Sequence, residues 1–195
     1  EAARKGLALG AGFCWRYAEA ERATYGEVLN GRIGDVRAMY TTYNAGGFPA
    51  PKARQPEWSD LENQLRNWHY YTWLSGDHIV EQAVHSIDWI EWAFGGRLPT
   101  RATAVGGRQV RTGPEYGHIY DHFSVTYEFE GGAKAFHMCR HWPNCANDNT
   151  ASILGTRGHA FVNGWGPVHQ IEGAEGGSWR YQGPRGNMYQ NEHNA

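Results

Sequence analysis

The alternation of apolar and polar residues along the chain predicts helices in the first half and mainly strands in the second. Residues 17–30 are typical of a helix, and DVRAMYTTY (35–43) alternates like a strand. After a Gly- and Pro-rich loop (44–60), a helix is expected from an N-cap at Asp77 to Gly95-Gly96. Further strands are expected at 100–108, 121–130, 133–141, 150–155, 159–163, 167–172 and 178–182. This order predicts an α+β fold, with one open, mainly antiparallel sheet and helices on one face.

The helix after Asp77 carries two patterns at helical spacing. Its predicted buried stripe comprises Ile79, Val80, Ala83, Val84, Ile87, Ile90 and Phe94. A second face comprises Glu81, His85, Asp88 and Trp92, and a spacing of four lets the Glu81 carboxylate hydrogen-bond the His85 imidazole and raise its pKa. A histidine held this way can exchange a proton with a hydroxyl group near neutral pH. On spacing alone, a solvated polar face with a chance Glu–His pair remains the alternative.

Composition excludes several classes of partner. The formal net charge is -2 and no acidic or basic tail is present, so neither a nucleic-acid nor a membrane-surface partner is supported. The apolar runs are far shorter than the roughly 20 residues needed to cross a bilayer. The three cysteines are an odd number, which argues against a disulfide framework and favours a reducing compartment, hence the cytoplasm. An exported form of the protein remains an alternative, because the sequence does not begin with an initiator Met and a signal peptide could precede it.

Two short motifs resemble ligand-binding patterns, one for zinc and one for a dinucleotide, but neither is assigned a ligand. HMCRHWPNC brings His137, Cys139, His141 and Cys145 close together, but the spacing matches no common zinc pattern, and strand alternation explains it. No metal is therefore predicted. LALGAGFCW begins like a dinucleotide-binding loop, yet Trp15 stands where that fingerprint needs a small residue, so a simple strand-to-loop turn is expected.

A longer set of motifs resembles one known family. SGDHIVEQAVHSIDWIEWAFGGRLPTRATAVGG, GHIYDHFSVTYEFEGGAKAFHM and ILGTRGHAFVNG are similar to the C-terminal domain of the Gfo/Idh/MocA family, the glucose–fructose oxidoreductase and inositol dehydrogenase relatives. EAARKGLALGAGFCWRY with LNGRIGDVRAMY resembles the junction between that family's Rossmann domain and its sheet domain. The resemblance implies a Rossmann remnant and junction at 1–16, a substrate and oligomerisation domain at 17–187, and the start of a C-terminal helix at 188–195. We therefore expect a piece of a longer protein.

The resemblance also implies a function. Members are NAD- or NADP-dependent oxidoreductases acting on a secondary alcohol of a sugar, polyol or related cyclic substrate, and their acid-x-x-x-His motif falls on Glu81 and His85 as the catalytic pair. Asp88 matches the continuation of that motif, and Arg16 matches a basic residue near the cleft. Most cofactor-binding residues would lie upstream, so this chain alone is expected to be inactive. Family members often associate through the open sheet face, which implies a homo-oligomer.

Three further residues are weaker candidates for contact with a sugar. Tyr120 and His122 are expected on the same side of a strand start near the cleft, with strand-edge packing as the alternative. Trp73 precedes the helix and is a candidate for stacking on a sugar ring, with core anchoring as the alternative. Two other functions stay open for the whole protein: a lyase or glycosidase that uses NAD transiently, and a non-catalytic oligomerisation or carbohydrate-binding domain.

Overall fold

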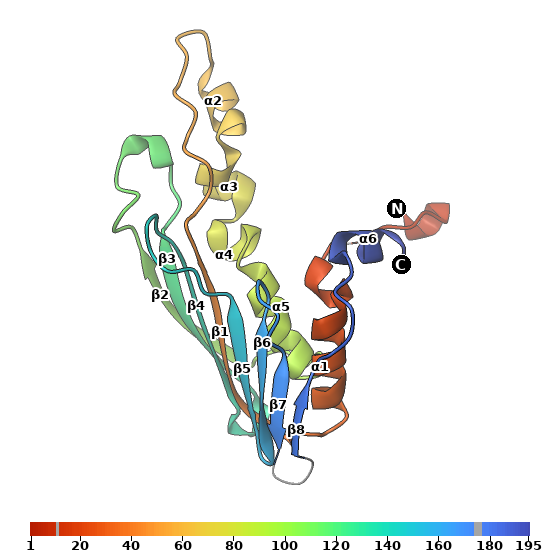
Figure 1. The fold of residues 1–195 in the computed structure, drawn as a ribbon. Coiled ribbons are helices and arrows are strands. Elements are labelled where there is room, and N and C mark those ends of the chain that lie inside the picture. The colour runs from red at the N-terminus through yellow and green to blue at the C-terminus, as the bar shows by residue number, and fades with distance from the viewer. Residues whose placement is uncertain (11, 174–176) are drawn as a thin grey trace.

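An eight-stranded open sheet forms the body of the molecule (Figure 1). This computed structural model describes residues 1–10, 12–173 and 177–195. The strand order is β2-β3-β4-β1-β5-β6-β7-β8, and every pairing is antiparallel except that between β1 and β4. The strands are β1 (Val36–Ala45), β2 (Arg101–Gly107), β3 (His122–Glu128), β4 (Lys134–His141), β5 (Thr150–Gly155), β6 (Gly158–Asn163), β7 (Gln170–Gly173) and β8 (Gly177–Arg180). The predicted α+β class with a mainly antiparallel sheet is confirmed.

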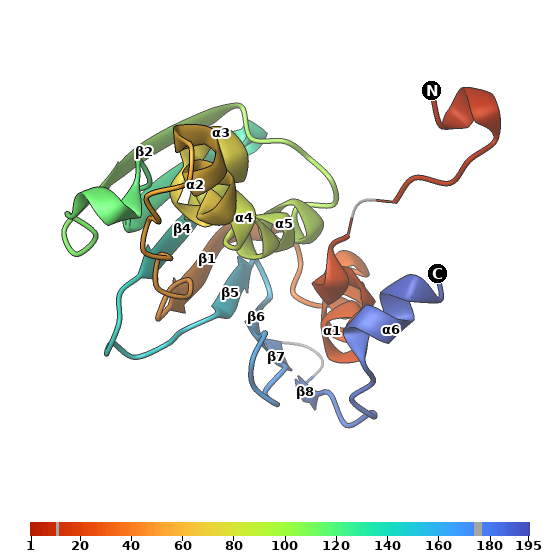
Figure 2. The same ribbon diagram turned by 90° about the horizontal axis from the view of Figure 1, so that it is seen from above.

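Helices cover one face of this sheet (Figure 2). The α-helices are α1 (Glu19–Leu29), α2 (Asp60–Arg66), α3 (Thr72–Ser75), α4 (His78–Glu81), α5 (Val84–Ala93) and α6 (Met188–His193). Short 3₁₀ helices are η1 (Ala3–Lys5), η2 (Cys14–Tyr17), η3 (Trp68–Tyr70), η4 (Pro114–Tyr116) and η5 (Glu130–Gly132). Among the described residues, no helix combines the length and apolar character needed to cross a membrane.

The two faces of the sheet differ along its central strands. On β1, Met39 and Thr41 are buried under the helices, whereas Tyr40 between them is half exposed on the opposite face. Tyr40 pairs in register with Phe136 of β4, and their rings stack with centroids 5.0 Å apart. Alternation of this kind follows from the period of two along a strand. The face without helices is therefore open and partly aromatic.

The core beneath the helices is built around aromatic rings. Trp89 of α5 is fully buried and stacks on Trp15 of η2 with ring centroids 4.4 Å apart, and Phe94 stacks on Phe129 at 3.9 Å. The predicted buried stripe is wrong in one place, because Val80 is more than half exposed. Trp89 was absent from that stripe and yet is central to the core.

Two segments differ from the structure expected from the sequence: the chain after the loop at 44–60 and the motif that resembles a dinucleotide-binding loop. The chain after the loop at 44–60 forms α2, whose N-cap Ser59 accepts a hydrogen bond from the backbone N–H of Glu62 at 3.1 Å. In the dinucleotide-like motif, Trp15 is buried as a core residue, and Ala11 lies outside the described residues. A large buried ring at this position leaves the segment without the close helix–strand packing that the fingerprint requires.

Candidate active site

The predicted helix through Glu81 and His85 is interrupted. The helix α4 ends at Glu81, Gln82 adopts φ -118° and ψ -49°, and α5 begins only at Val84. The backbone N–H of His85 donates to the carbonyl of Gln82 at 3.2 Å, three residues back, so the chain turns more tightly here than an α-helix does. The single continuous helix was therefore wrong between Glu81 and Val84, and the relative directions of the two side chains change.

His85 lies at an aromatic wall in the first turn of α5. Its ring centroid is 5.1 Å from that of Trp15 and 6.0 Å from that of Phe13, which meets it edge-on. The ring nitrogen Nδ1 is buried and has no hydrogen-bond partner among the described residues. Burial lowers the pKa of His85, while the negative charges of Asp88 and Glu192 partly oppose that effect. His85 is therefore neutral at pH 7, in the form that accepts a proton.

Glu81 does not support His85 in the expected way. Among the described residues its Oε2 is buried and unpartnered, so the predicted hydrogen bond to the imidazole is absent, as is the predicted rise of the pKa of His85. The break at Gln82 is the physical reason, since the two side chains are no longer one regular turn apart. Burial raises the pKa of Glu81 itself. The pKa of Tyr43 rises to about 12, mainly through burial and further through the charge of Glu81, which brings Tyr43 into the same region.

Arg16 and Asp88 bind each other. Arg16 Nε and Nη2 each donate to one carboxylate oxygen of Asp88 at 2.8 Å, and Nη2 also donates to Glu91 at 2.9 Å. The guanidinium lies over the ring of Trp92, 5.1 Å from its centroid. This bidentate pair fastens η2, which carries Trp15, to α5, which carries His85. The structure thus brings both predicted residues to the site, in contact with each other.

Tyr120 and His122 lie at the start of β3. The backbone N–H of Tyr120 donates to Asp77 Oδ2 at 2.8 Å, and His122 Nδ1 lies 2.8 Å from Asp121 Oδ1. Burial alone would raise the pKa of Asp121, but hydrogen bonds from the Arg111 backbone and from His122 hold it well below its usual value. Tyr120 is partly exposed beside the N-terminus of α4. In the described part of the chain, no hydrogen bond or ring contact joins Tyr120 or His122 to His85.

Trp73 lies on α3, away from the aromatic wall. Its side chain is more than half exposed, and its indole Nε1 donates to Gln64 Oε1 of α2 at 2.7 Å. Core anchoring, the alternative for this residue, is wrong. No ring contact or hydrogen bond in the described part of the chain links Trp73 to His85.

Strand β4 carries three of the residues that suggested zinc. His137, Cys139 and His141 are buried on the same face, as strand alternation predicted, whereas Cys145 is exposed. His137 Nδ1 lies 2.8 Å from Thr41 Oγ1. No group of three or more His, Cys, Asp or Glu side chains in the described residues is placed to hold a metal ion.

The site includes residues that the sequence pattern did not indicate. Tyr43 stacks on Trp15 at 6.1 Å, and Trp165 meets Tyr43 edge-on at 5.5 Å. Glu192 of α6 places its charge near both His85 and Cys14. These residues come from β1, from the turn after β6 and from α6. The one available signal was a tryptophan in the Gly-rich turn NGWGP, where core packing does not require an aromatic side chain.

Comparison with known proteins gives a consistent set of relatives. Residues 27–161 match the family model described as the GFO/IDH/MocA C-terminal domain, which is more than half of the chain. The trans-1,2-dihydrobenzene-1,2-diol dehydrogenase of Sus scrofa is 25% identical over 162 residues, which are 83% of this chain and 41% of the relative. The 2,7-anhydro-N-acetylneuraminate hydratase of Escherichia coli strain K12 is 24% identical over 139 residues, covering 70% and 32%.

Solved structures share the same fold. The aldose-aldose oxidoreductase from Caulobacter crescentus, complexed with glycerol, superimposes with a TM-score of 0.77 at 18% identity, covering 97% of this chain and 52% of its own. A levoglucosan dehydrogenase in complex with NADH and levoglucosan gives 0.74 at 17% identity, covering 97% and 55%. The chain thus spans about half the length of the structures it matches, and less than half of the two curated relatives.

Proposed function

The chain belongs to the GFO/IDH/MocA family, and on that premise we propose that it is the sheet domain of an NAD- or NADP-dependent oxidoreductase that acts on a secondary alcohol of a sugar or polyol. The observation that carries this proposal is His85, a neutral imidazole at an aromatic wall. Two relatives support the cofactor and the substrate class, since a levoglucosan dehydrogenase binds NADH and an aldose-aldose oxidoreductase binds glycerol.

His85 acts as the base in the oxidation direction. A neutral imidazole accepts the proton of the substrate hydroxyl as the alcohol carbon is oxidised, and the imidazolium returns that proton in the reverse direction. Asp88 and Glu192 favour the protonated form, so they stabilise the imidazolium that this step creates. Glu81 is assigned as the second catalytic group, because its buried Oε2 has no partner among the described residues and can accept a hydrogen bond from a substrate hydroxyl.

The other predicted residues receive more limited roles. Arg16 and Asp88 position His85 by joining η2 to α5. We assign Tyr120, His122 and Trp73 to contacts with a part of the substrate farther from the reacting hydroxyl. Among the described residues, no ring contact or hydrogen bond joins any of the three to His85. A bound nicotinamide supplies the hydride acceptor. Among the described residues, the motif around Gly10 and Gly12 does not fit the phosphate-binding loop of a dinucleotide, because Trp15 is buried at the position where that loop needs a small residue.

The test uses the full-length protein with a panel of sugars and polyols and either NAD or NADP. We expect sustained production of reduced nicotinamide, and a loss of roughly 10²–10⁴-fold in kcat in His85→Ala, the usual contribution of a general acid–base. His118→Ala, which removes an exposed histidine, serves as the control and should keep wild-type turnover. Equal activity of His85→Ala and wild type would reject the catalytic role and favour a non-catalytic sheet domain.

A second candidate keeps the site and changes the net reaction. One relative is named a hydratase, which is not a net redox activity. In that reading the hydroxyl is oxidised only transiently, which acidifies the neighbouring C–H bond before elimination. Consumption of sugar without accumulation of reduced nicotinamide, still dependent on His85, would favour this candidate.

Self-association through the open sheet face is proposed as well. Tyr40, Val105, Met138 and Leu154 are exposed there, although each is large and apolar. Large exposed apolar patches on a sheet commonly mark contacts with a partner. A second copy of the chain is the partner that the family resemblance implies.

A further inference from the structure

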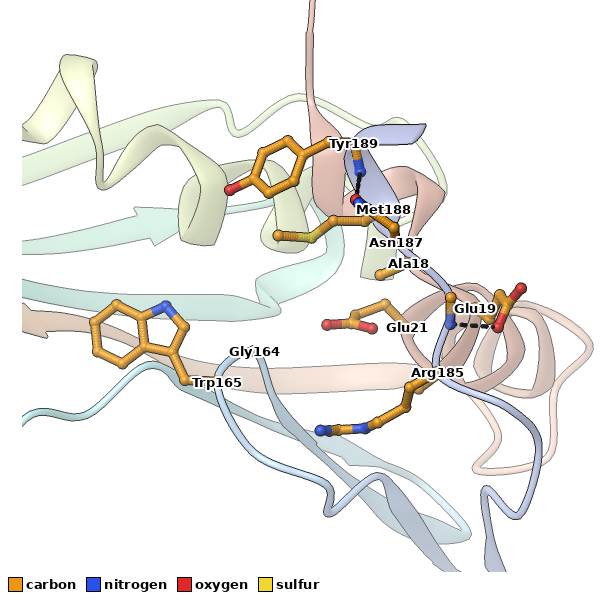
Figure 3. Close-up of a pocket in the computed structure, with 11 residues that line it drawn as sticks. Ala18, Glu19, Glu21, Gly164, Trp165, Arg185, Asn187, Met188 and Tyr189 are labelled. Carbon is orange, nitrogen blue, oxygen red and sulfur yellow. Dashed lines mark hydrogen bonds between the residues drawn. The ribbon is translucent and has the colours of Figure 1, made fainter. Parts of the chain in front are cut away.

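A second concave site lies beside the candidate active site and shares Trp165 with it, where the start of α1, the turn after β6 and the segment before α6 meet (Figure 3). Its cavity volume is about 290 Å³. Its polar and aromatic lining side chains are those of Glu19, Glu21, Trp165, Arg185, Asn187 and Tyr189. The catalytic role proposed above uses none of them. Three distant parts of the sequence thus contribute polar and aromatic groups to one pocket.

Glu21 is the unusual member of this pocket. Its side chain is only 5% exposed, and Figure 3 shows its carboxyl group directed into the cavity. Among the described residues, no hydrogen bond or ion pair joins that carboxyl group to another side chain, whereas the neighbouring Glu19 carboxylate accepts from the backbone N–H of Gly186 at 2.9 Å. Burial raises the pKa of Glu21 to about 7, although a hydrogen bond from its own backbone N–H and the charge of Arg185 partly oppose this. A buried carboxyl group that no other side chain satisfies is costly to keep charged, so hydrogen-bond donors from a ligand would stabilise its charged form.

The remaining groups supply a donor and a flat apolar surface. Arg185 projects along the pocket below Glu21, and its Nη2 also donates to the carbonyl of Gly166 (Figure 3). Trp165 is about half exposed at the other end of the pocket. Its ring meets Tyr43 edge-on. In the orientation of the Asn149 side-chain amide that satisfies its hydrogen bonds, the amide oxygen accepts from the indole N–H of Trp165 at 3.3 Å. The indole is therefore held in place before any ligand arrives.

The charge balance selects the kind of ligand. A simple anion would be repelled by Glu21 and Glu19, and a simple cation would be repelled by Arg185. A neutral molecule with several hydroxyl groups satisfies both, because a hydroxyl donates to a carboxylate and accepts from a guanidinium. The volume of about 290 Å³ lies at the lower end of the roughly 300–1,000 Å³ of small-molecule sites, which suits a single ring.

We propose that this pocket binds one hydroxylated sugar ring, with Glu21 accepting from its hydroxyls, Arg185 donating to them and Trp165 packing against its C–H face. The inference rests on the proposed function for the class of ligand. His85 is not among the lining residues of this pocket, and Trp165 is linked to it through successive ring contacts with Tyr43 and Trp15. The ring is either the distal unit of the substrate or a free sugar.

The test measures binding of glucose and of maltose to the full-length protein by calorimetry at pH 7. Wild type should bind, and both Glu21→Gln and Trp165→Ala should weaken binding at least about tenfold, as expected when a charge-assisted hydrogen bond or a packed ring is lost. Glu27→Gln lies on the same helix outside the pocket and should bind as wild type does. Because Trp165 is half exposed, its variant keeps the test decisive if Glu21→Gln does not fold.

Proton release gives a readout that a structural role of Glu21 would not move. With a pKa of about 7, Glu21 is about half protonated at pH 7, and donors from a sugar favour its charged form. Binding should therefore release up to about half a proton, detected as different heats in phosphate and Tris buffers. Glu21→Gln should release none. Buffer-independent heats in wild type would overturn the assignment of Glu21.

Further measurements distinguish a ring of the substrate from a free sugar, and the pocket proposal from the catalytic role of His85. A rise in KM for maltose alone in Glu21→Gln assigns the ring to the substrate, whereas glucose binding without competition against turnover assigns it to a free sugar. Absence of binding to wild type, or unchanged binding in both variants, overturns the pocket proposal. His85→Ala should leave binding at this pocket intact, so failure of the catalytic proposal would be seen separately, as turnover that persists without His85.

Discussion

Acidification from pH 7 to pH 5 is expected to destabilise the chain through His137 and His141. Both rings are fully buried, and His137 Nε2 and both nitrogens of His141 have no partner among the described residues. Burial, together with neighbouring His78, lowers the pKa of His137 to about 3 and that of His141 to about 2; Arg111 also contributes at His141. Both pKa values lie below that of an unfolded histidine, about 6.5. The stability they contribute is therefore complete above about pH 6.5 and is lost as the pH falls.

The magnitude follows from proton linkage. Between pH 7 and pH 5 an unfolded histidine passes from about one-quarter to almost fully protonated, while each folded ring stays neutral. Integration over that range gives about 2 kcal/mol for each histidine, or about 4 kcal/mol for the pair. That is a large fraction of the roughly 5–15 kcal/mol by which ordinary domains are stable.

Urea unfolding at pH 7, 6 and 5 measures this loss in the wild-type chain, in His141→Phe and in His118→Phe as the exposed control. His141→Phe removes two unsatisfied nitrogens from a site already packed against the rings of Phe48 and His78, so its stability at pH 7 should match or exceed that of wild type. Its loss between pH 7 and pH 5 should be smaller by about 2 kcal/mol. Contributions from other histidines cancel in the difference between variants. An equal loss in wild type and His141→Phe would refute the reasoning.

Two further predictions concern an ion pair and a surface. Arg16→Gln leaves the nearly buried carboxylate of Asp88 without its bidentate partner, and a cost of about 2 kcal/mol is expected after allowing for the partial exposure of Arg16. The urea midpoint measures it, and Arg54→Gln, from an exposed pair, should change stability by less than about 1 kcal/mol. Met138→Lys places a charge on the open sheet face and should dissociate the oligomer that we propose for the full-length protein in sedimentation experiments, whereas an unchanged mass would exclude that face.

The sheet was predictable where its signal was local. Alternation of buried and exposed residues identified β1, and the EGG turn identified the hairpin between β3 and β4. The parallel pairing of β1 with β4 was not predictable, because nothing local in either strand specifies a partner so far along the chain. The break after Glu81 was also hidden, since Gln82 and Ala83 are residue types that favour a helix.

The site was predictable only in part for the same reason. The spacing that selected Glu81 and His85 assumed a regular helix, and the hydrogen bond that it predicted between the two side chains is absent from the described residues. Trp165 and Glu192 reach the site through the fold alone, from the turn after β6 and from α6. A pattern within one helix carries no information about rings and charges that arrive from other elements.

The parallel pairing of β1 and β4 also determines when the sheet can be completed during synthesis. Thr41 and its partner His137 are 96 residues apart along the chain. At about 5–20 residues per second, a ribosome needs about 5–20 s to produce the second strand after the first. Throughout that interval both edges of β1 lack the strands with which they pair, β4 and β5. The nascent chain is therefore a candidate client for chaperones that bind unpaired strands, until residue 155 has left the exit tunnel.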